Sequence, residues 1–284
     1  MPAHAYTSAQ LSAALADGLV AAGVRRLFGL PGGGPNLDMI GAAAERGIGF
    51  VLTRGETEAC VMAGAFGLLT GTTGAALVTR GPGLASAANG LAQATLDRAP
   101  LLLLSDCVSA DGRDRTGHQR VDQLAVTSPL TLWNGTLGRR DPAVTVASAA
   151  ALAAGPPAGA VQLDYDPSAP GDTPPPTPEP AGVADHALRR ARTMATSCRR
   201  PVVVFGAGAP PHAAALRRVL VDTEIPVLTT YQALGTVDAT GPQAAGLFTN
   251  AALERQLLEQ ADLVIGVGLD GVEPMPGPWA YPTP

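Results

Sequence analysis

The chain has 284 residues, of which 46% are apolar, and a formal net charge of −5. This length allows one large or two ordinary domains with a sizeable buried core. The acidic balance gives no electrostatic footprint for nucleic acid, and the complete absence of lysine excludes a Walker A phosphate site and a Schiff-base enzyme.

The three cysteines, Cys60, Cys107 and Cys198, are odd in number and lack metal-ligand spacing. This pattern argues against a disulfide framework and against a zinc site. The sequence also contains no run of about 18 apolar residues and no signal peptide. We therefore expect a cytoplasmic protein whose cysteines are small buried hydrophobes.

Residues 1–165 alternate between short apolar strands and alanine-rich helices. The pattern predicts, in chain order, a helix at 8–22, a strand at 26–30, a helix at 36–46, a strand at 50–53, a helix at 59–69, a strand at 75–79, a helix at 84–94, a strand at 100–105 and a final strand at 159–163. Such alternation indicates parallel strands whose crossover helices cover both faces of the sheet. We expect one α/β domain here.

The stretch 166–183 is rich in proline, which continues neither a helix nor a strand ladder, and is predicted to be an extended linker. Residues 184–284 return to the α/β pattern. Their predicted elements are a helix at 185–197, a strand at 201–205, a helix at 212–222, a strand at 225–229, a helix at 251–260 and a strand at 262–266. The expected fold is thus two doubly wound parallel-sheet α/β domains joined by a proline-rich linker.

Three glycine-rich turns follow predicted strands: Gly32-Gly33-Gly34, Gly81-Pro82-Gly83 and Gly206-Ala207-Gly208. The first and third lack the third glycine of a dinucleotide-binding fingerprint, which disfavours a nicotinamide site. Tight turns with positive backbone dihedrals explain both of them. The second opens a helix whose free amides could hold an anion, although a simple turn explains it equally well.

Glu56 lies where the strand at 50–53 turns into a helix, and two roles suit it. Thr53 and Glu56 have the T-x-x-E spacing of a capping box, in which both side chains satisfy amides at the helix start. Such caps are commoner than active sites. A catalytic carboxylate is the alternative.

The order of the motifs favours that alternative. An F-G-x-P-G-G turn from Phe28, an R-x-E-x-x-A helix start from Arg54 and the G-P-G turn at 81–83 precede the segments 118–123 and 129–134. Together these motifs resemble the pyrimidine-binding domain of thiamine-diphosphate enzymes, closest to the acetolactate synthase and benzaldehyde lyase group. The strand-like segments of the second half are similar to the middle domain of the same enzymes. The resemblance implies a pyrimidine-binding domain at 1–165 and a partial middle domain at 184–284.

The resemblance also implies roles for individual residues. Glu56 would bond the aminopyrimidine ring of thiamine diphosphate and activate the cofactor, and Ser86 stands where the family often has asparagine. Gln119 matches a glutamine that points into the active site, and His118 beside it is a second catalytic candidate, because its ordinary pKa suits proton transfer near neutrality. A solvated loop residue is the alternative for His118. The implied cofactor-binding residues are Glu56, Gly32, Gly33, Pro82, Gly83 and Ser86.

The family's diphosphate-binding domain, which holds Mg²⁺ through a G-D-G start and a downstream asparagine, has no counterpart here. The Gly171-Asp172 pair lies in the proline-rich stretch and lacks both companions, so no metal site is predicted. We expect a cofactor-activating subunit of a split 2-oxo-acid decarboxylase or carboligase, with Mg²⁺ held by a partner chain that carries the diphosphate domain. The assembly would be a homodimer or a two-plus-two heterotetramer. The alternatives are a non-catalytic assembly protein of the same fold and a fragment of a longer enzyme.

Overall fold

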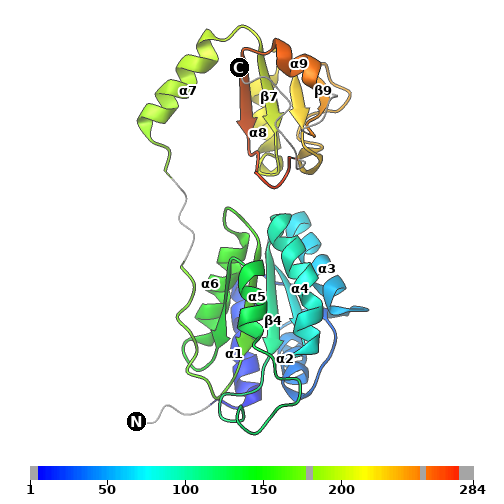
Figure 1. Ribbon diagram of the computed structural model, residues 1–284, viewed down its shortest axis with the longest axis vertical. Helices are drawn as coiled ribbons and strands as arrows, with labels where there is room; N and C mark the ends of the chain where they lie inside the picture. Colours follow the sequence, from blue (N-terminus) through cyan, green and yellow to red (C-terminus); the bar gives the residue numbers. More distant parts are fainter. Residues whose placement is uncertain (1–5, 177–181, 250–253, 275–284) are drawn as a thin grey trace. The chain divides into compact units, whose positions relative to one another are not determined.

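The computed structural model describes residues 6–176, 182–249 and 254–274. Its contacts divide the chain into two units, Met1–Pro180 and Ala181–Pro284. Each unit contains one parallel sheet with helices around it (Figure 1). The predicted fold class, doubly wound parallel-sheet α/β, is therefore confirmed.

Unit 1, Met1–Pro180, contains a six-stranded parallel sheet in the order β2-β1-β3-β4-β6-β5. The elements in chain order are α1 (Ser8–Ala21), β1 (Arg26–Gly29), α2 (Gly34–Glu45), β2 (Gly49–Leu52), α3 (Glu56–Thr70), β3 (Gly74–Val78), α4 (Pro82–Leu96), β4 (Leu101–Asp106), α5 (Gln123–Thr127), β5 (Trp133–Leu137), α6 (Pro142–Ala154) and β6 (Ala160–Tyr165). The individually predicted elements all form, within three residues of their predicted bounds. α5, β5 and α6 lie in a stretch for which no single element was predicted.

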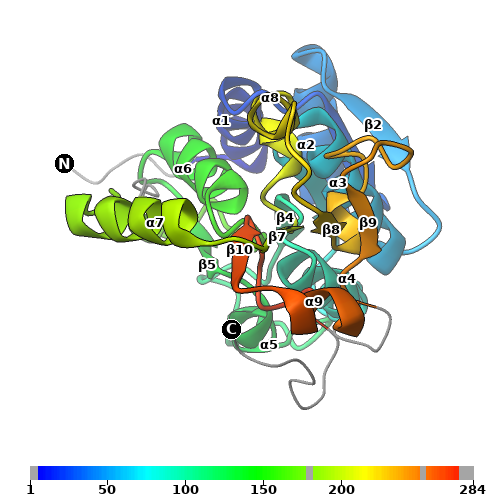
Figure 2. The same cartoon turned by 90° about the horizontal axis from the view of Figure 1, so that it is seen from above.

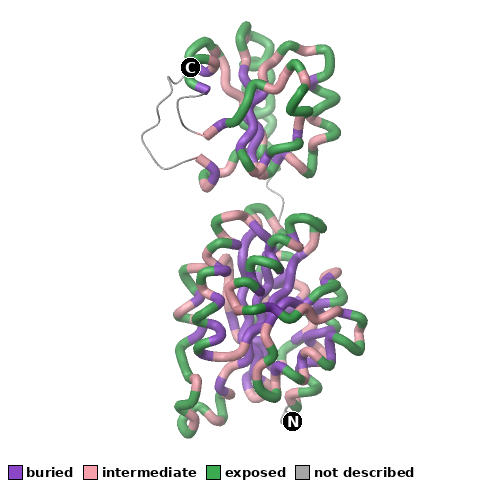
Figure 3. Tube along the Cα trace, turned by 90° about the vertical axis from the view of Figure 1, so that its right-hand side faces the viewer, coloured by how far each residue is buried: buried purple, intermediate pink, exposed green. Residues whose placement is uncertain are grey.

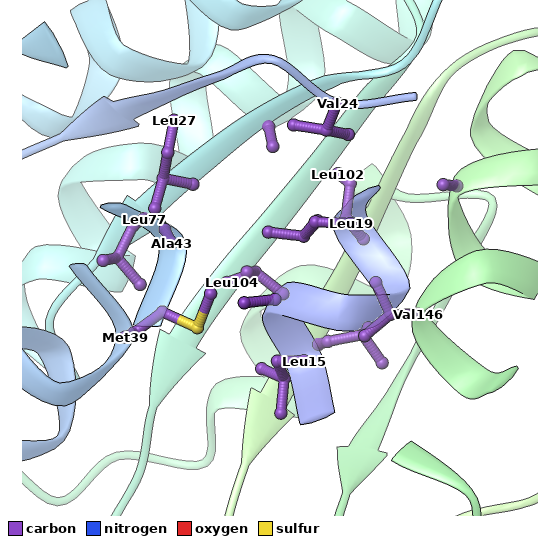
Figure 4. Close-up of a cluster of buried hydrophobic side chains, with 14 of the residues drawn as sticks. Leu15, Leu19, Val24, Leu27, Met39, Ala43, Leu77, Leu102, Leu104 and Val146 are labelled. Atoms are coloured by element: carbon purple, nitrogen blue, oxygen red, sulfur yellow. The ribbon is translucent and has the colours of Figure 1, made fainter. Parts of the chain in front are cut away.

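Helices cover both faces of this sheet. On one face, side chains of α1, α2 and α6, among them Leu19 and Val146, join a buried cluster with Leu102 of β4 (Figure 4). On the other face, α3 and α4 form a second cluster with Leu103 of the same strand. Because both faces are covered, the central strands are buried throughout and read as continuous apolar runs (Figure 3). Among the described residues, no helix is long and apolar enough to cross a membrane.

α3 and α4 approach each other closely because α4 carries Gly90 at the contact. A Cβ atom at Gly90 would collide with the Cβ atom of Cys60 and would lie 3.0 Å from the carbonyl oxygen of Thr57. The Thr57 hydroxyl also donates a hydrogen bond of 2.6 Å to the carbonyl oxygen of Ser86. The first turns of the two helices are thereby fixed relative to each other.

The beginning of the proline-rich stretch is hydrogen-bonded to unit 1. The Asp172 amide donates to the Thr136 carbonyl oxygen at 2.8 Å, and the Thr136 amide donates to the Asp172 carboxylate at 2.7 Å. The Arg140 amide donates to the Pro170 carbonyl oxygen at 2.9 Å. The Asp172 carboxylate thus has a structural partner in β5.

Unit 2, Ala181–Pro284, contains a four-stranded parallel sheet in the order β10-β7-β8-β9. Its elements are α7 (Asp185–Ser197), β7 (Pro201–Phe205), α8 (Ala213–Leu220), β8 (Val227–Thr229), β9 (Ala244–Leu247), α9 (Arg255–Gln260) and β10 (Leu263–Val267). The helix predicted at 251–260 is described from residue 254 onward, and 251–253 lie outside the described residues. β9 was not predicted, because its sequence Ala-Ala-Gly-Leu lacks the branched and aromatic residues typical of strands.

The two glycines Gly90 and Gly41 offer a matched test of the α3–α4 contact, since both lie inside helices. We expect Gly90→Ala to lower the free energy of unfolding by about 1–3 kcal/mol, the usual cost of overpacking. Gly41→Ala, where a Cβ atom would meet nothing within 4 Å, should raise it by about 0.5–1 kcal/mol through helix propensity. Urea unfolding followed by circular dichroism measures both. Equal stability of the two variants would show that α3 and α4 do not pack this closely.

Candidate active site

The carboxyl ends of β1, β2, β3 and β4 bring the predicted site residues to one edge of the sheet of unit 1. Gly32 follows β1, Glu56 follows β2, the turn 81–83 follows β3, and Gln119 lies in the loop after β4. In the sheet, β1 has β2 on one side and β3 on the other. The chain therefore reverses its direction of winding at β1, and such a switch point is where open α/β sheets bind ligands.

Glu56 is the first residue of α3, and it does not take part in a capping box. The N-cap residue is Gly55, and no side chain caps the helix. The Thr53 hydroxyl instead donates a hydrogen bond of 3.0 Å to the Gly55 carbonyl oxygen. The capping-box interpretation is wrong because the three residues before Glu56 are not helical, so that Thr53 lies too far upstream to be the N-cap.

The Glu56 carboxylate is half-buried and faces the first turn of α4. A Cβ atom at Gly83 would lie 3.3 Å from Oε1 of Glu56 and 2.6 Å from Cγ2 of Thr79. No hydrogen bond from the described residues engages this carboxylate. Burial, and secondarily the Glu56 charge, raise the pKa of the Cys60 thiol to about 12. Glu56 is thus a carboxylate whose oxygens accept no hydrogen bond from the described residues and which lies close to the backbone of Gly83.

The turn 81–83, hereafter the Gly81 turn, is held from two sides. The Gly81 amide donates a hydrogen bond of 2.8 Å to Oε1 of Gln123, and the Arg80 amide donates one of 2.8 Å to Oδ1 of Asp106. The Arg80 guanidinium Nε lies 3.0 Å from the other oxygen of Asp106. Gly81 has φ of +62°, and a Cβ atom there would collide with the Gln119 carbonyl oxygen. Only glycine fits this position.

Two buried carboxyl groups, those of Asp106 and Asp164, are hydrogen-bonded to residues that hold the Gly81 turn. Asp164 accepts hydrogen bonds of 2.5 Å from Gln123 Nε2 and 2.8 Å from Gln162 Nε2. Burial raises the pKa of Asp164 to about 7, against these hydrogen bonds. Burial also raises the pKa of Asp106, although the Arg80 charge opposes that shift. Sequence reasoning missed Asp106, Gln123 and Asp164, and the available signal was that both aspartates lie at or near the carboxyl end of an apolar strand.

A cavity of about 380 Å³ lies beside the Gly81 turn. Its lining includes Cys107, Arg113, Gln119, Arg120, Gln123 and Asp164. Gln119 adopts φ of +55° and is partly buried, whereas His118 is exposed and does not line the cavity. The structure therefore brings Gln119 to the site and leaves His118 in the surrounding loop.

The remaining predicted residues surround the same edge. Gly32 must be small because a Cβ atom there would lie 2.8 Å from Cβ of Thr79, while Gly33 is the exposed N-cap of α2. Pro82 and Ser86 are exposed on the first turns of α4.

The predicted positive dihedrals of the turns 32–34 and 206–208 are wrong, since no glycine of either turn has positive φ. Close contact with the side chains of Asn36 and Thr79 explains Gly32 instead, and close approach of the Leu269 and Gly268 backbone explains Gly206.

These residues fit one part of a thiamine diphosphate molecule. The free Glu56 carboxylate can accept a hydrogen bond from a ring nitrogen, and the absence of a side chain at Gly83 lets this carboxylate lie close to the first turn of α4. The diphosphate requires a metal ion with oxygen ligands. The described part of the chain contains no group of three or more His, Cys, Asp or Glu side chains that could hold one. The fit is therefore to the aminopyrimidine ring.

Comparisons with known proteins agree with this geometry. Residues 9–126 match the family model described as thiamine pyrophosphate enzyme, N-terminal TPP binding domain. Residues 188–279 match the model described as thiamine pyrophosphate enzyme, central domain. The chain belongs to the thiamine pyrophosphate enzyme family.

Several curated relatives are similar to this chain over most of its length. The chain is 31% identical to an acetolactate synthase of Bacillus subtilis over 278 residues, which are 93% of this chain and 48% of that protein. It is 31% identical to a catabolic acetolactate synthase of Raoultella terrigena, over 98% of this chain and 52% of that protein. It is 30% identical to a 2-hydroxyacyl-CoA lyase of Oryza sativa, over 90% of this chain and 47% of that protein. The chain thus spans about half the length of these relatives.

The raised pKa of Asp164 makes the stability of unit 1 depend on pH. The folded-state pKa of about 7 exceeds the ordinary value of 3.8, so the folded state binds the Asp164 proton more tightly than the unfolded state does. The contribution of this proton to the free energy of unfolding is therefore present at low pH and is lost as the pH rises through 7. Asp164→Asn removes this titration and keeps an acceptor oxygen for the two glutamines. We expect the variant to gain stability relative to the wild type between pH 4.5 and 8, by up to about 1.4 kcal/mol for each unit of pKa shift.

Urea unfolding at several pH values measures this difference. Asp114→Asn, which changes an exposed carboxylate in the loop after β4, is the control and should not alter the pH dependence. A constant difference between Asp164→Asn and the wild type from pH 4.5 to 8 would contradict a raised pKa of Asp164.

Proposed function

We propose that this chain is the cofactor-activating subunit of a split, acetolactate synthase-like 2-oxo-acid decarboxylase or carboligase. The observation that carries the proposal is the Glu56 carboxylate, half-buried at the switch point, opposite Gly83, with no protein hydrogen bond among the described residues. Because no donor of the described residues occupies it, this carboxylate remains able to accept a hydrogen bond from a ligand. Family membership supplies the ligand that this acceptor fits.

Each site residue then has a role toward the cofactor. Thiamine diphosphate, when bound, supplies an electron sink for the carbon from which carbon dioxide leaves. Glu56 would accept a hydrogen bond from the aminopyrimidine ring and share a proton with it. The other ring contacts would come from Gly32, Gly33, Pro82, Gly83 and Ser86.

The loop after β4 would face the substrate. Gln119 lines the cavity beside the Gly81 turn, and its amide can orient a substrate carboxylate or carbonyl group. His118, exposed in the same loop, would exchange protons once the site is assembled. We propose that a partner chain supplies the Mg²⁺ ligands and the diphosphate-binding domain.

Replacement of Glu56 tests the central role. With the partner present, Glu56→Gln should cut turnover by at least the ~10²-fold typical of lost acid–base catalysis, because the amide cannot share a proton with the ring. Folding should be preserved, since no hydrogen bond of the described residues depends on this carboxylate. Carbon dioxide release from a 2-oxo acid measures turnover, and circular dichroism measures folding.

Glu58→Gln is the matched control, because Glu58 lies two residues further along the same helix turn and is exposed. Its effect on turnover should be mild. Near-normal turnover of Glu56→Gln would reject the activating role. Absence of activity in the wild-type complex would favour the non-catalytic assembly protein.

Cofactor binding should depend on the partner. The aminopyrimidine offers only a few hydrogen bonds of about 1 kcal/mol each, or somewhat more to the charged carboxylate. Most of the cofactor's charge lies on its diphosphate, which this chain would not hold. Calorimetric titration with Mg²⁺ and thiamine diphosphate should show little or no binding to the chain alone and tight binding after the partner is added. Tight Mg²⁺-dependent binding to the chain alone would reject the split-enzyme model.

We also propose that unit 1 pairs through α3 and α4. The outer side of α3 exposes Met62, Leu68 and Leu69, the last of them 88% exposed, and exposed apolar side chains of this kind are often covered by a partner. Light scattering should show at least a homodimer, and a two-plus-two complex with the partner. Replacing Leu69 with Arg should weaken the association, whereas Val219→Arg, at an exposed position of α8, should not. A strictly monomeric chain under both conditions would contradict the pairing.

A further inference from the structure

Unit 2 has its own switch point, at the carboxyl ends of β7 and β10. β7 lies between β10 and β8, and all four strands of the sheet are parallel. α8, which joins β7 to β8, and α9, which precedes β10, lie on opposite faces of the sheet (Figure 2). The crevice outside the ends of β7 and β10 is therefore the position at which α/β sheets of this kind bind ligands, commonly through phosphate groups.

Two backbone turns form this crevice. The turn 206–208 follows β7, and Gly268, with φ of +64°, follows β10. The Gly208 amide donates a hydrogen bond of 2.9 Å to the Gly268 carbonyl oxygen. A Cβ atom at Gly208 would lie 3.0 Å from the Gly268 Cα atom, so the two turns pack backbone against backbone. This arrangement leaves the amides of Ala207 and Asp270 pointing into the crevice.

The Glu273 carboxylate occupies the crevice. Its oxygens lie 2.9 and 3.0 Å from the Ala207 amide nitrogen, and Oε2 accepts a hydrogen bond of 2.9 Å from the Asp270 amide. The Thr230 hydroxyl, which follows β8, donates to Oε1. Glu273 is only 3% exposed. Donors from three separate segments thus converge on one carboxylate.

The three groups that donate to Glu273 are of the kind that bind anions in proteins. No ion pair within the described residues reaches Glu273, so its charge is balanced by two backbone amides and one hydroxyl. Backbone amides at a turn after a parallel strand are the groups that cradle phosphate and carboxylate ligands. A Cβ atom at position 206 would lie 2.5 Å from Oε2 of Glu273, so Gly206 is needed for the carboxylate to come this close to the backbone.

We propose that the crevice of unit 2 is an anion site that Glu273 fills from within the chain, and that this carboxylate excludes the phosphate groups of nucleotides. The ligand chemistry of the site is an anion with at least two oxygens, such as a carboxylate or a phosphate. An external ligand of this class binds only if Glu273 leaves. This inference concerns unit 2 alone and does not rest on the function proposed for unit 1.

Removal of the side chain in the full chain tests the proposal. Glu273→Ala leaves the amides of Ala207 and Asp270 without an acceptor, and its melting temperature should fall. Formate or inorganic phosphate should restore part of this loss when compared with chloride at equal ionic strength, because either anion can enter the vacated position. The wild type should show no such selective effect. ADP should bind Glu273→Ala at least about tenfold more tightly than the wild type in calorimetry, a difference of ~1.4 kcal/mol.

Thr230→Val is the matched control, since it removes one donor and leaves the carboxylate in place. It should be destabilised, and formate should not restore its stability. If Glu273→Ala does not fold in chloride, its refolding yield in formate against chloride gives the same comparison. Stability or yield that responds to formate no more than that of the wild type would show a purely structural carboxylate. ADP binding to the wild type as tight as to the variant would show an open crevice. Either result would overturn the proposal.

Discussion

The hydrogen bonds that hold the Gly81 turn are the interaction on which the candidate active site depends. Asp106 from β4 and Gln123 from α5 accept hydrogen bonds from the amides of Arg80 and Gly81, which follow the end of β3. This contact sets where α4 begins, and it therefore places Gly83 opposite Glu56. It also sets the position of the loop after β4, because the Gln119 carbonyl oxygen packs directly on Gly81. A change in this one turn would displace both sides of the site.

Holding the turn in this way has a free-energy cost, because buried carboxylates lose their hydration. Asp106 is compensated by the Arg80 guanidinium, 3.0 Å away. Within the described residues no ion pair reaches Asp164, which relies on the side-chain amides of Gln123 and Gln162, and burial raises its pKa to about 7. Since Gln123 serves both the Gly81 turn and Asp164, the protonation of a buried carboxyl group is linked to the geometry of the site.

Local patterns in the sequence predicted the elements that position the site. The apolar runs of β3 and β4, the glycine turns and the acidic residue after β2 all follow from periodicity and spacing within a few residues. The contacts among them do not. Gln123 meets Asp164 across 41 residues and Asp106 across 17, and no local spacing indicates such pairs. The capping-box interpretation failed although the T-x-x-E spacing is present, because α3 begins at Glu56 with Gly55 as its N-cap and the Thr53 hydroxyl bonds the Gly55 carbonyl oxygen instead.

The two units use the same edge of a parallel sheet in opposite ways. In both, a glycine turn after a strand at the switch point brings backbone close to a glutamate carboxylate, Glu56 in unit 1 and Glu273 in unit 2. Glu273 accepts hydrogen bonds from three donors of its own unit and is only 3% exposed. Binding of an external ligand would therefore have to break these hydrogen bonds. Glu56 receives none among the described residues and stays half-buried, so an external donor can still lower its free energy. Both units have the same type of sheet edge and a glutamate carboxylate at it. What differs between them is the number of hydrogen-bond donors that the chain itself supplies to that carboxylate.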